Sequence, residues 1–204
     1  MIIKIVVVGD LNTNCYIVAS ERTREALIID PGDDAKKIIN AVEAEKLKPV
    51  LIVNTHAHPD HIGANLELAK RYGIVAAVGK DDYEQIKAWG SYFEEFAELD
   101  IEDLVYERML KAGDMVEAGE LQLKVLGTPG HSRGSICLYG DGILFSGDTL
   151  FAGDCGRTDI PGGSESEMET SLAMLMKLPE GTKVYPGHGR STTIGKEKKL
   201  YVKY

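Results

Sequence analysis

The sequence predicts an α+β protein built as a four-layer αβ/βα sandwich, in which two β-sheets pack together and helices cover their outer faces. Short β-rich runs separated by glycine-containing turns occur in both halves of the chain, and amphipathic helical segments lie between them. The chain has 204 residues, of which 44% are hydrophobic and 27% charged, which is typical of a globular domain. We therefore expect residues 1–204 to form a single domain.

Strands and helices are expected to alternate along the first 78 residues. Apolar residues at helical spacing, such as Ile38 and Val42, predict a helix after a Pro-Gly turn. The short apolar run at residues 50–53 is typical of a strand that is covered on both faces. In chain order we expect strands at 2–8, 15–19 and 26–29, the helix after residue 34, the strand at 50–53, a helix at 62–72 and a strand at 74–78.

An acidic segment follows at residues 81–107, with ten acidic residues and one basic residue. The charge of this segment, −9, equals the net charge of the whole chain. Asp81 is a candidate helix N-cap. Apolar residues recur behind it at helical spacing, at Ile86, Trp89, Phe93 and Phe96. This pattern predicts a helical acidic insertion at about residues 80–111 that covers the core, with a lid over the functional site as the alternative. The rest of the chain is neutral and has no basic stripe, which argues against a nucleic-acid partner.

The last third of the chain is expected to form the second sheet and its cover. A capping box at Ser164 and Glu167 predicts a helix that runs through Leu178. The expected strands are at residues 121–126, 135–138, 143–145 and 183–185.

The sequence also predicts a cytoplasmic protein without membrane contacts. Its longest apolar runs, such as Ile2–Val8, are far shorter than the ~20 residues of a membrane span, and the N-terminus lacks a signal-peptide pattern. The three cysteines are an odd number at unrelated spacings, which favours free thiols in a reducing compartment. We expect Cys15 and Cys137 to pack in the core and Cys155 to have a role in its loop.

The residues that carry chemistry follow the apolar strand at 50–53. The motif THAHPDH at residues 55–61 places three imidazoles and a carboxylate within six residues. His56 and His58 are two residues apart, so in an extended chain they point the same way and are suited to share one metal. Pro59 turns the chain toward a helix, where Asp60 and His61 are presented from another direction.

The remaining histidines and a further aspartate lie in similar loops. His131 lies in TPGHSRGS at residues 128–135, Asp148 in FSGDTLF at 145–151, and His188 in PGHG at 186–189. Glycine in these loops allows close backbone approach, which converging ligands from distant segments require. A purely structural role would scatter the five histidines over the chain, whereas all five lie in these motifs.

With these motifs, the sequence resembles the metallo-β-lactamase-fold hydrolases, and among them a short-chain branch similar to glyoxalase II (hydroxyacylglutathione hydrolase). The resemblance spans nearly the whole chain in the family's order and implies the metallo-β-lactamase fold. It further implies two divalent metal ions, zinc or iron, or else manganese. One metal would be bound by His56, His58 and His131, and the second by Asp60, His61 and His188, with Asp148 bridging both.

The implied activity is thioester hydrolysis. In it a metal-bound hydroxide attacks the carbonyl of a small-molecule thioester, with Asp60 and Asp148 as catalytic residues. A thiol has a pKa near 8.5, so the thiolate leaves without a strong general acid. A site rich in metal ligands and poor in other acid-base groups fits this reaction.

The sequence departs from glutathione-using glyoxalase II enzymes at two points. Sixteen residues follow His188, so the C-terminal helical region that helps to bind glutathione is not expected. Their lysine and tyrosine pair is replaced by Arg157 and Asp159 in CGRTD. Arg157 remains a candidate to bind a substrate carboxylate, whereas Asp159 cannot replace a tyrosine.

Three alternatives remain open at this point. CGRTD resembles persulfide dioxygenases and short bacterial glyoxalase II-like proteins alike. Persulfide dioxygenases hold one Fe(II) with two histidines and one aspartate of this motif set, and a lactonase would use the same metal pair. A non-catalytic metal-binding domain is disfavoured because structural zinc sites are closed by four protein ligands. Hydrolysis of β-lactams is not expected, because β-lactamases of this fold generally lack the bridging aspartate that Asp148 supplies.

Overall fold

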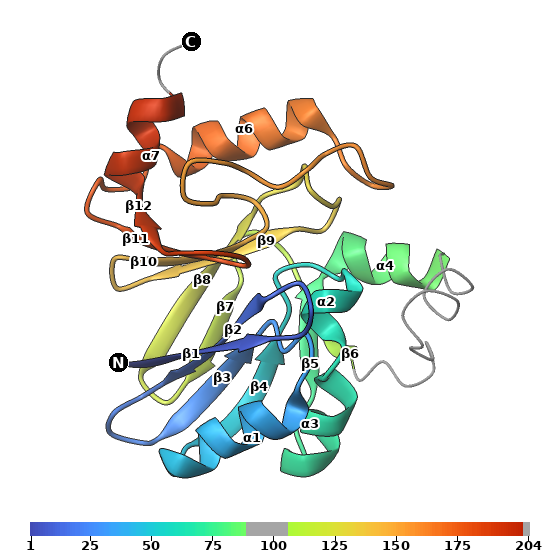
Figure 1. The fold of residues 1–204 in the computed structure, drawn as a ribbon, viewed down its shortest axis with the longest axis vertical. Coiled ribbons are helices and arrows are strands. Elements are labelled where there is room, and N and C mark those ends of the chain that lie inside the picture. The colour runs from blue at the N-terminus through green and yellow to red at the C-terminus, as the bar shows by residue number, and fades with distance from the viewer. Residues whose placement is uncertain (89–105, 202–204) are drawn as a thin grey trace.

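The computed structural model describes residues 1–88 and 106–201 and has the expected four layers. Two six-stranded sheets pack face to face, in the orders β1-β2-β3-β4-β5-β6 and β12-β11-β10-β9-β8-β7. Helices α1 and α3 lie outside the first sheet, and α6 and α7 lie outside the second (Figure 1). The predicted αβ/βα sandwich is therefore confirmed.

The first sheet begins as an antiparallel meander and continues with parallel strands. Helices connect its parallel strands, as crossover connections require. In chain order the elements are β1 (Ile2–Val8), β2 (Thr13–Ala19), β3 (Glu25–Ile29), α1 (Ala35–Ala44), β4 (Lys48–Val53), α2 (Pro59–Ile62), α3 (Asn65–Tyr72), β5 (Ala76–Gly79), α4 (Lys80–Ala88) and β6 (Tyr106–Leu110).

The second sheet is antiparallel except between β10 and β11, which pair in parallel and are connected through α6. Its elements are β7 (Met115–Ala118), β8 (Leu121–Gly127), β9 (Ile136–Gly140), β10 (Ile143–Gly147), α6 (Glu165–Leu175), β11 (Lys183–Pro186), β12 (Thr192–Thr193) and α7 (Ile194–Tyr201). Sequence analysis missed β7, β12 and α7, of which the two strands have only four and two residues.

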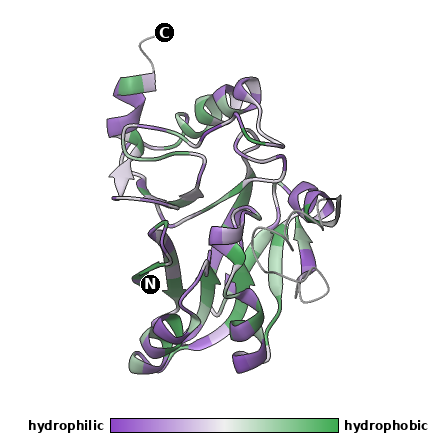
Figure 2. Ribbon diagram, turned by 45° about the vertical axis from the view of Figure 1, so that its right-hand side comes forward, coloured by the Kyte–Doolittle hydropathy of each residue, from purple (hydrophilic) through white to green (hydrophobic). Residues whose placement is uncertain are grey.

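The core is divided among the three interfaces between the four layers. Successive residues of β2 and β3 alternate between two clusters of buried side chains. Ile17 and Ile28 face the helices, while Val18 and Leu27 face the other sheet. Alternation with a period of two explains why these strands are apolar throughout, and Figure 2 shows the hydrophobic colour on strands inside the sandwich. Each such side chain stabilises the fold by about 1.5–3 kcal/mol relative to an exposed one.

The sequence signals for helix starts and ends predicted some of the observed helix boundaries and missed others. Ser164 caps α6 as predicted, because its side chain accepts a hydrogen bond from the backbone N–H of Glu167. The helix ends at Leu175 rather than Leu178, and at Leu178 Pro179 disfavours helical backbone. The helix expected at 62–72 begins only at Asn65, as α3, and a separate short helix, α2, precedes it and has Gly63 as its C-cap.

The helical insertion expected at about residues 80–111 is wrong at its C-terminal end. There, residues 106–110 form β6, which pairs in parallel with β5. Tyr106 is buried and its hydroxyl donates a hydrogen bond to Asn54, so this segment is part of the sheet and its core. At the other end α4 is helical and buries Ile86 as predicted. Trp89, Phe93 and Phe96 lie outside the described residues.

The cysteines and the lengths of the apolar runs were also considered in the sequence analysis. Cys15 and Cys137 are buried free thiols in the core, and Cys155 is a half-buried free thiol. Within residues 1–88 and 106–201, none of the helices has the length and apolar character needed to cross a bilayer.

Candidate metal centre

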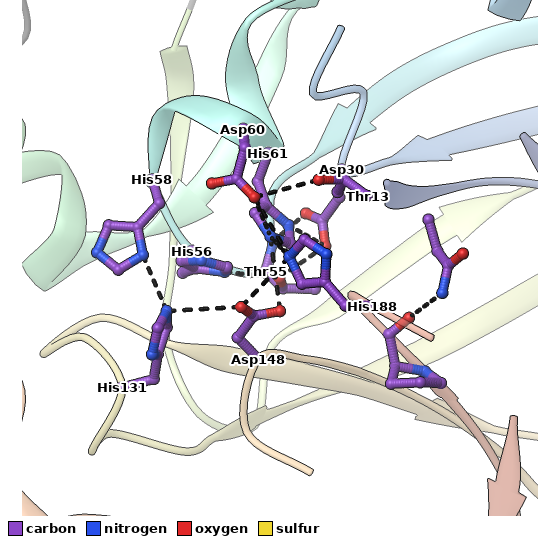
Figure 3. A network of polar contacts seen from close by, with 12 residues as sticks. Thr13, Asp30, Thr55, His56, His58, Asp60, His61, His131, Asp148 and His188 are labelled. Carbon is purple, nitrogen blue, oxygen red and sulfur yellow. Dashed lines mark hydrogen bonds and ion pairs between the residues drawn. The ribbon is translucent and has the colours of Figure 1, made fainter. Parts of the chain in front are cut away.

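The five histidines and two aspartates singled out in the sequence meet at one end of the sandwich. His56, His58, Asp60 and His61 follow β4, while His131 lies between β8 and β9. Asp148 and His188 follow the parallel strands β10 and β11. Because parallel strands present their carboxyl ends at the same edge, side chains from distant segments converge there (Figure 3).

The first group of side chains consists of His56, His58 and His131, and we call it the first cluster. One ring nitrogen of each lies within 4.8 Å of the others. Nδ1 of His58 is 2.9 Å from Nε2 of His131, and the ring of His56 is edge-on to both of the other rings. The expectation that His56 and His58 face a common point is therefore met, and His131 joins them from the other sheet.

The second cluster consists of Asp60, His61 and His188, again with ligand atoms within 4.8 Å. Nε2 of His61 lies 3.3 Å from Nε2 of His188 and 3.4 Å from Oδ2 of Asp60. Nε2 of His188 lies 3.2 Å from the same carboxylate oxygen. Three polar atoms from α2 and the loop after β11 thus surround one small space.

Asp148 lies between the two clusters. Its Oδ2 is 3.7 Å from Nε2 of His131 in the first cluster and 3.6 Å from Nε2 of His188 in the second. Its Oδ1 is 3.5 Å from Nε2 of His61. Figure 3 shows the carboxylate pointing into the space that the two clusters share.

Three buried atoms of this arrangement have no hydrogen-bond partner among the described residues, namely Nε2 of His56, Nδ1 of His61 and Oδ1 of Asp148. Of these, Nδ1 of His61 lies 3.2 Å from a carboxylate oxygen of Asp30. Leaving such atoms unpaired is unfavourable unless another group binds them. Imidazole nitrogens and carboxylate oxygens are suitable ligands for zinc, iron and manganese. The donor set and its unpaired buried atoms therefore fit divalent metal ions.

Two imidazoles of the first cluster, those of His56 and His58, are neutral at neutral pH. Burial, together with the neighbouring histidines, holds the pKa of His56 well below its usual value. The same two causes lower the pKa of His58 to about 3. A neutral imidazole offers the lone pair that a metal needs. No proton therefore has to leave these two rings before a metal binds at neutral pH.

In the second cluster, by contrast, nearby carboxylates favour a protonated histidine. Burial lowers the pKa of His61, but the carboxylates of Asp148, Asp30 and Asp60 outweigh it and raise that pKa to about 9. Burial also raises the pKa of Asp148, against the opposing effect of nearby histidines. Without a metal, this half of the site pairs its carboxylates with a protonated imidazole, and a divalent cation would replace that positive charge.

Hydrogen bonds to the outer nitrogens of two rings fix which nitrogen faces the site. Nδ1 of His131 donates to the carbonyl oxygen of Arg157 at 2.8 Å, and Nδ1 of His188 donates to that of Leu11 at 3.1 Å. A carbonyl can only accept, so Nε2 of each ring keeps its lone pair for the site. The backbone thus sets the tautomers that metal binding requires.

Sequence analysis missed Asp30, which supports the second cluster. Its Oδ2 lies 3.2 Å from Nδ1 of His61, and its carboxylate accepts hydrogen bonds from the backbone N–H and the hydroxyl of Thr55. Asp30 is 1% exposed and follows β3 directly. Its position after a strand, next to the parallel strand that precedes the THAHPDH motif, is the signal that could have identified it.

Arg157 has a different position from the metal-ligand candidates. Its guanidinium forms a two-point ion pair with Asp159, with N–O distances of 2.8 and 3.0 Å, and the side chain is exposed. Only its backbone carbonyl contacts the clusters, through His131. Binding of a substrate carboxylate by this guanidinium would compete with Asp159, and this role of Arg157 stays a prediction.

Gly187 is required where β11 approaches Asp148. A Cβ at this position would lie 2.2 Å from Oδ1 of Asp148 and 2.8 Å from Cε1 of His61. We expect Gly187→Ala to displace the Asp148 carboxylate and to reduce the bound metal per chain, as measured by elemental analysis of the purified protein. Gly181→Ala is the control, because no atom lies within 4 Å of its added Cβ. Equal metal content in both variants would contradict this prediction.

The fold and the two clusters define a class of protein, an αβ/βα sandwich with a divalent-metal site at one edge of its paired sheets. Comparison with family models gives a more specific identification, because residues 8–188 match the metallo-beta-lactamase superfamily. The chain belongs to this superfamily, whose members are mostly hydrolases.

Two curated relatives agree with this assignment over nearly the full length. The chain is 33% identical to a probable metallo-hydrolase, YqgX, of Bacillus subtilis, covering 92% of this chain and 90% of that protein. It is 29% identical to the hydroxyacylglutathione hydrolase GloC of Haemophilus influenzae, covering 98% and 96%.

Three solved structures with the same fold are similar to this chain. The chain is 34% identical to TTHA1623 in a di-iron-bound form, with a TM-score of 0.83 and coverage of 95% and 96%. The B3 metallo-beta-lactamase BLEG-1 is 32% identical, with a TM-score of 0.84 and coverage of 97% of each chain. ETHE1 from Myxococcus xanthus is 29% identical, with a TM-score of 0.82 and coverage of 98% and 82%. These similarities support the family and do not select one substrate.

Proposed function

We propose that the protein is a metal-dependent hydrolase of the glyoxalase II type, which cleaves a small-molecule thioester. The observation that carries this proposal is the position of Asp148, whose carboxylate lies between two groups of three candidate ligands. A carboxylate in that position is suited to bridge two cations. Similarity to the hydroxyacylglutathione hydrolase of H. influenzae supports the thioester as substrate class.

We assign one metal to His56, His58 and His131 and the other to Asp60, His61 and His188, with Asp148 shared. Zinc and iron are the proposed metals, with manganese as an alternative. When bound, such a pair supplies a water-derived nucleophile at neutral pH and polarises a carbonyl.

The protein's own residues hold this site in a fixed arrangement. The hydroxyl of Thr13 donates to Oδ2 of Asp60 at 3.1 Å, which orients the carboxylate toward His61 and His188. Asp60 and Asp148 also balance part of the metal charge, while the imidazoles remain neutral ligands. The leaving thiolate needs no strong acid, because the pKa of a thiol is near 8.5.

Further parts of the proposal concern the surroundings of the reaction. We propose that the enzyme acts in the cytoplasm on a soluble thioester, such as a hydroxyacyl-thiol conjugate, without nucleic acid or membrane partners. Arg157 is the candidate to bind a carboxylate of the substrate, in exchange for its ion pair with Asp159.

The decisive experiment measures metal content and hydrolysis on the same preparation. Thioesters, lactones and a β-lactam are tested together, the last because BLEG-1 is described as a B3 metallo-beta-lactamase. We expect about two metal ions per chain and thioester cleavage that a chelator abolishes and added metal restores. Hydrolysis of lactones without hydrolysis of thioesters would make the protein a lactonase rather than a thioesterase. A full metal content without any turnover would contradict an enzymatic function.

A mononuclear iron dioxygenase acting on persulfides is the second candidate function. It is favoured by a group of two histidines and one aspartate, His56, His61 and Asp148, with ligand atoms within 4.8 Å. The CGRTD sequence at residues 155–159 fits this function but also resembles short bacterial glyoxalase II-like proteins. One iron per chain together with oxygen consumption on a persulfide would favour this function over hydrolysis.

A further inference from the structure

A buried carboxylate outside both clusters connects the two loops that form the first cluster. We propose that Asp82 is a positioning residue that sets the separation of these loops and thereby prepares His56, His58 and His131 for a metal. This inference rests on the proposed metal centre and adds a residue that belongs to none of its ligand motifs.

Asp82 lies in the first turn of α4 and is only 2% exposed. Its Oδ2 accepts hydrogen bonds from the backbone N–H of Ala57 at 2.9 Å and from the hydroxyl of Ser132 at 2.8 Å. Its Oδ1 accepts one from the backbone N–H of Gly134 at 2.6 Å. Three donors thus satisfy a carboxylate that would otherwise be costly to bury.

These three donors belong to the two ligand loops. Ala57 lies between His56 and His58, and Ser132 directly follows His131. One side chain therefore connects the loop of the first sheet with the loop of the second sheet, next to three of the proposed ligands. A second link is present farther back, where the N–H of Ile136 donates to the carbonyl of Thr55 at 2.8 Å.

The backbone around Asp82 leaves no space for other side chains. A Cβ at Gly134 would lie 2.2 Å from the backbone nitrogen of Asp82. A Cβ at Gly79, just before α4, would lie 1.9 Å from the carbonyl oxygen of Gly134. The start of α4 is therefore in direct backbone contact with the loop after His131, which holds the Asp82 carboxylate at a fixed position.

Asp82→Asn tests this role with little change in volume. An amide has one acceptor oxygen, so the backbone N–H groups of Ala57 and Gly134 cannot both keep their partner. Glu197→Gln is the matched control. Glu197 is also a buried carboxylate, 3% exposed, and it accepts hydrogen bonds from the N–H of Gly153 and the hydroxyl of Thr192, away from both first-cluster loops.

The two metal dissociation constants of each variant are measured by competition with a chromophoric chelator, and the folding of the metal-free protein is followed by circular dichroism. We expect Asp82→Asn to weaken one of the two sites by about 10–100-fold, the range typical of groups that orient metal ligands. The other site should keep its affinity, and Glu197→Gln should leave both unchanged. Cobalt spectra identify the weakened site as the one with three nitrogen ligands.

The possible results separate this inference from the proposed metal centre. Two wild-type affinities in Asp82→Asn, or an equal loss in Glu197→Gln, would overturn the role of Asp82 alone. A wild-type protein that binds no metal would overturn the metal centre and this inference together. If Asp82→Asn does not fold, Ser132→Ala removes only one of the three hydrogen bonds and should weaken the same site to a smaller extent. Unchanged affinity in that variant would contradict the inference.

Discussion

Asp148→Ala is expected to abolish thioester hydrolysis and to remove at least one of the two metal ions. The carboxylate of Asp148 lies within 4 Å of ligand atoms from both clusters. Without it, His61 and His188 lose a negative neighbour, and the cation charge of both sites loses its shared counter-charge. Loss of several kcal/mol of transition-state stabilisation corresponds to a rate decrease on the order of 10³-fold or more.

The measurement combines elemental analysis with the initial rate on a thioester under saturating metal. Asp114→Ala is a suitable control, because Asp114 is a carboxylate in a surface turn that accepts a hydrogen bond from the backbone of Lys111. It should keep both metals and the wild-type rate. Two metals and a normal rate in Asp148→Ala would refute the assignment of Asp148 as the bridging residue.

The candidate ligands could be found from the sequence because each one carries a local signal. His56 and His58 stand directly after an apolar strand, and His131 and His188 stand next to glycine. Their convergence was expected from these strand-end loops and from the family resemblance, since no strand order was predicted from the sequence. In the structure, parallel strands bring such residues to one edge of a sheet. The position of Asp148 after β10 obeys the same rule.

The supporting carboxylates were missed because their partners are distant in the sequence. Asp82 is bound by backbone N–H groups 25 and 52 residues away, and such contacts leave no pattern near Asp82 itself. Its neighbourhood showed only an acidic, helix-forming segment. The same segment misled the prediction at residues 106–110, where pairing with β5 outweighs any local helical preference.

Removing one ligand from either cluster should leave one metal bound, at the other cluster. His188→Ala leaves the first cluster complete and takes away a second-cluster ligand whose Nε2 lies 3.3 Å from that of His61. His58→Ala leaves the second cluster complete and removes the partner of Nε2 of His131 at 2.9 Å. We expect each variant to hold about one metal per chain.

Cobalt substitution distinguishes the two remaining sites, since the first cluster offers three nitrogen ligands and the second two nitrogens and a carboxylate oxygen. We expect the spectrum of the three-nitrogen site in His188→Ala, the other spectrum in His58→Ala, and neither in the double variant. Because Asp148 lies against both clusters, hydrolysis should fall in both single variants, by on the order of 10²-fold or more. A metal content that stays at the wild-type value in His188→Ala would contradict the assignment of His188 as a ligand of the second metal.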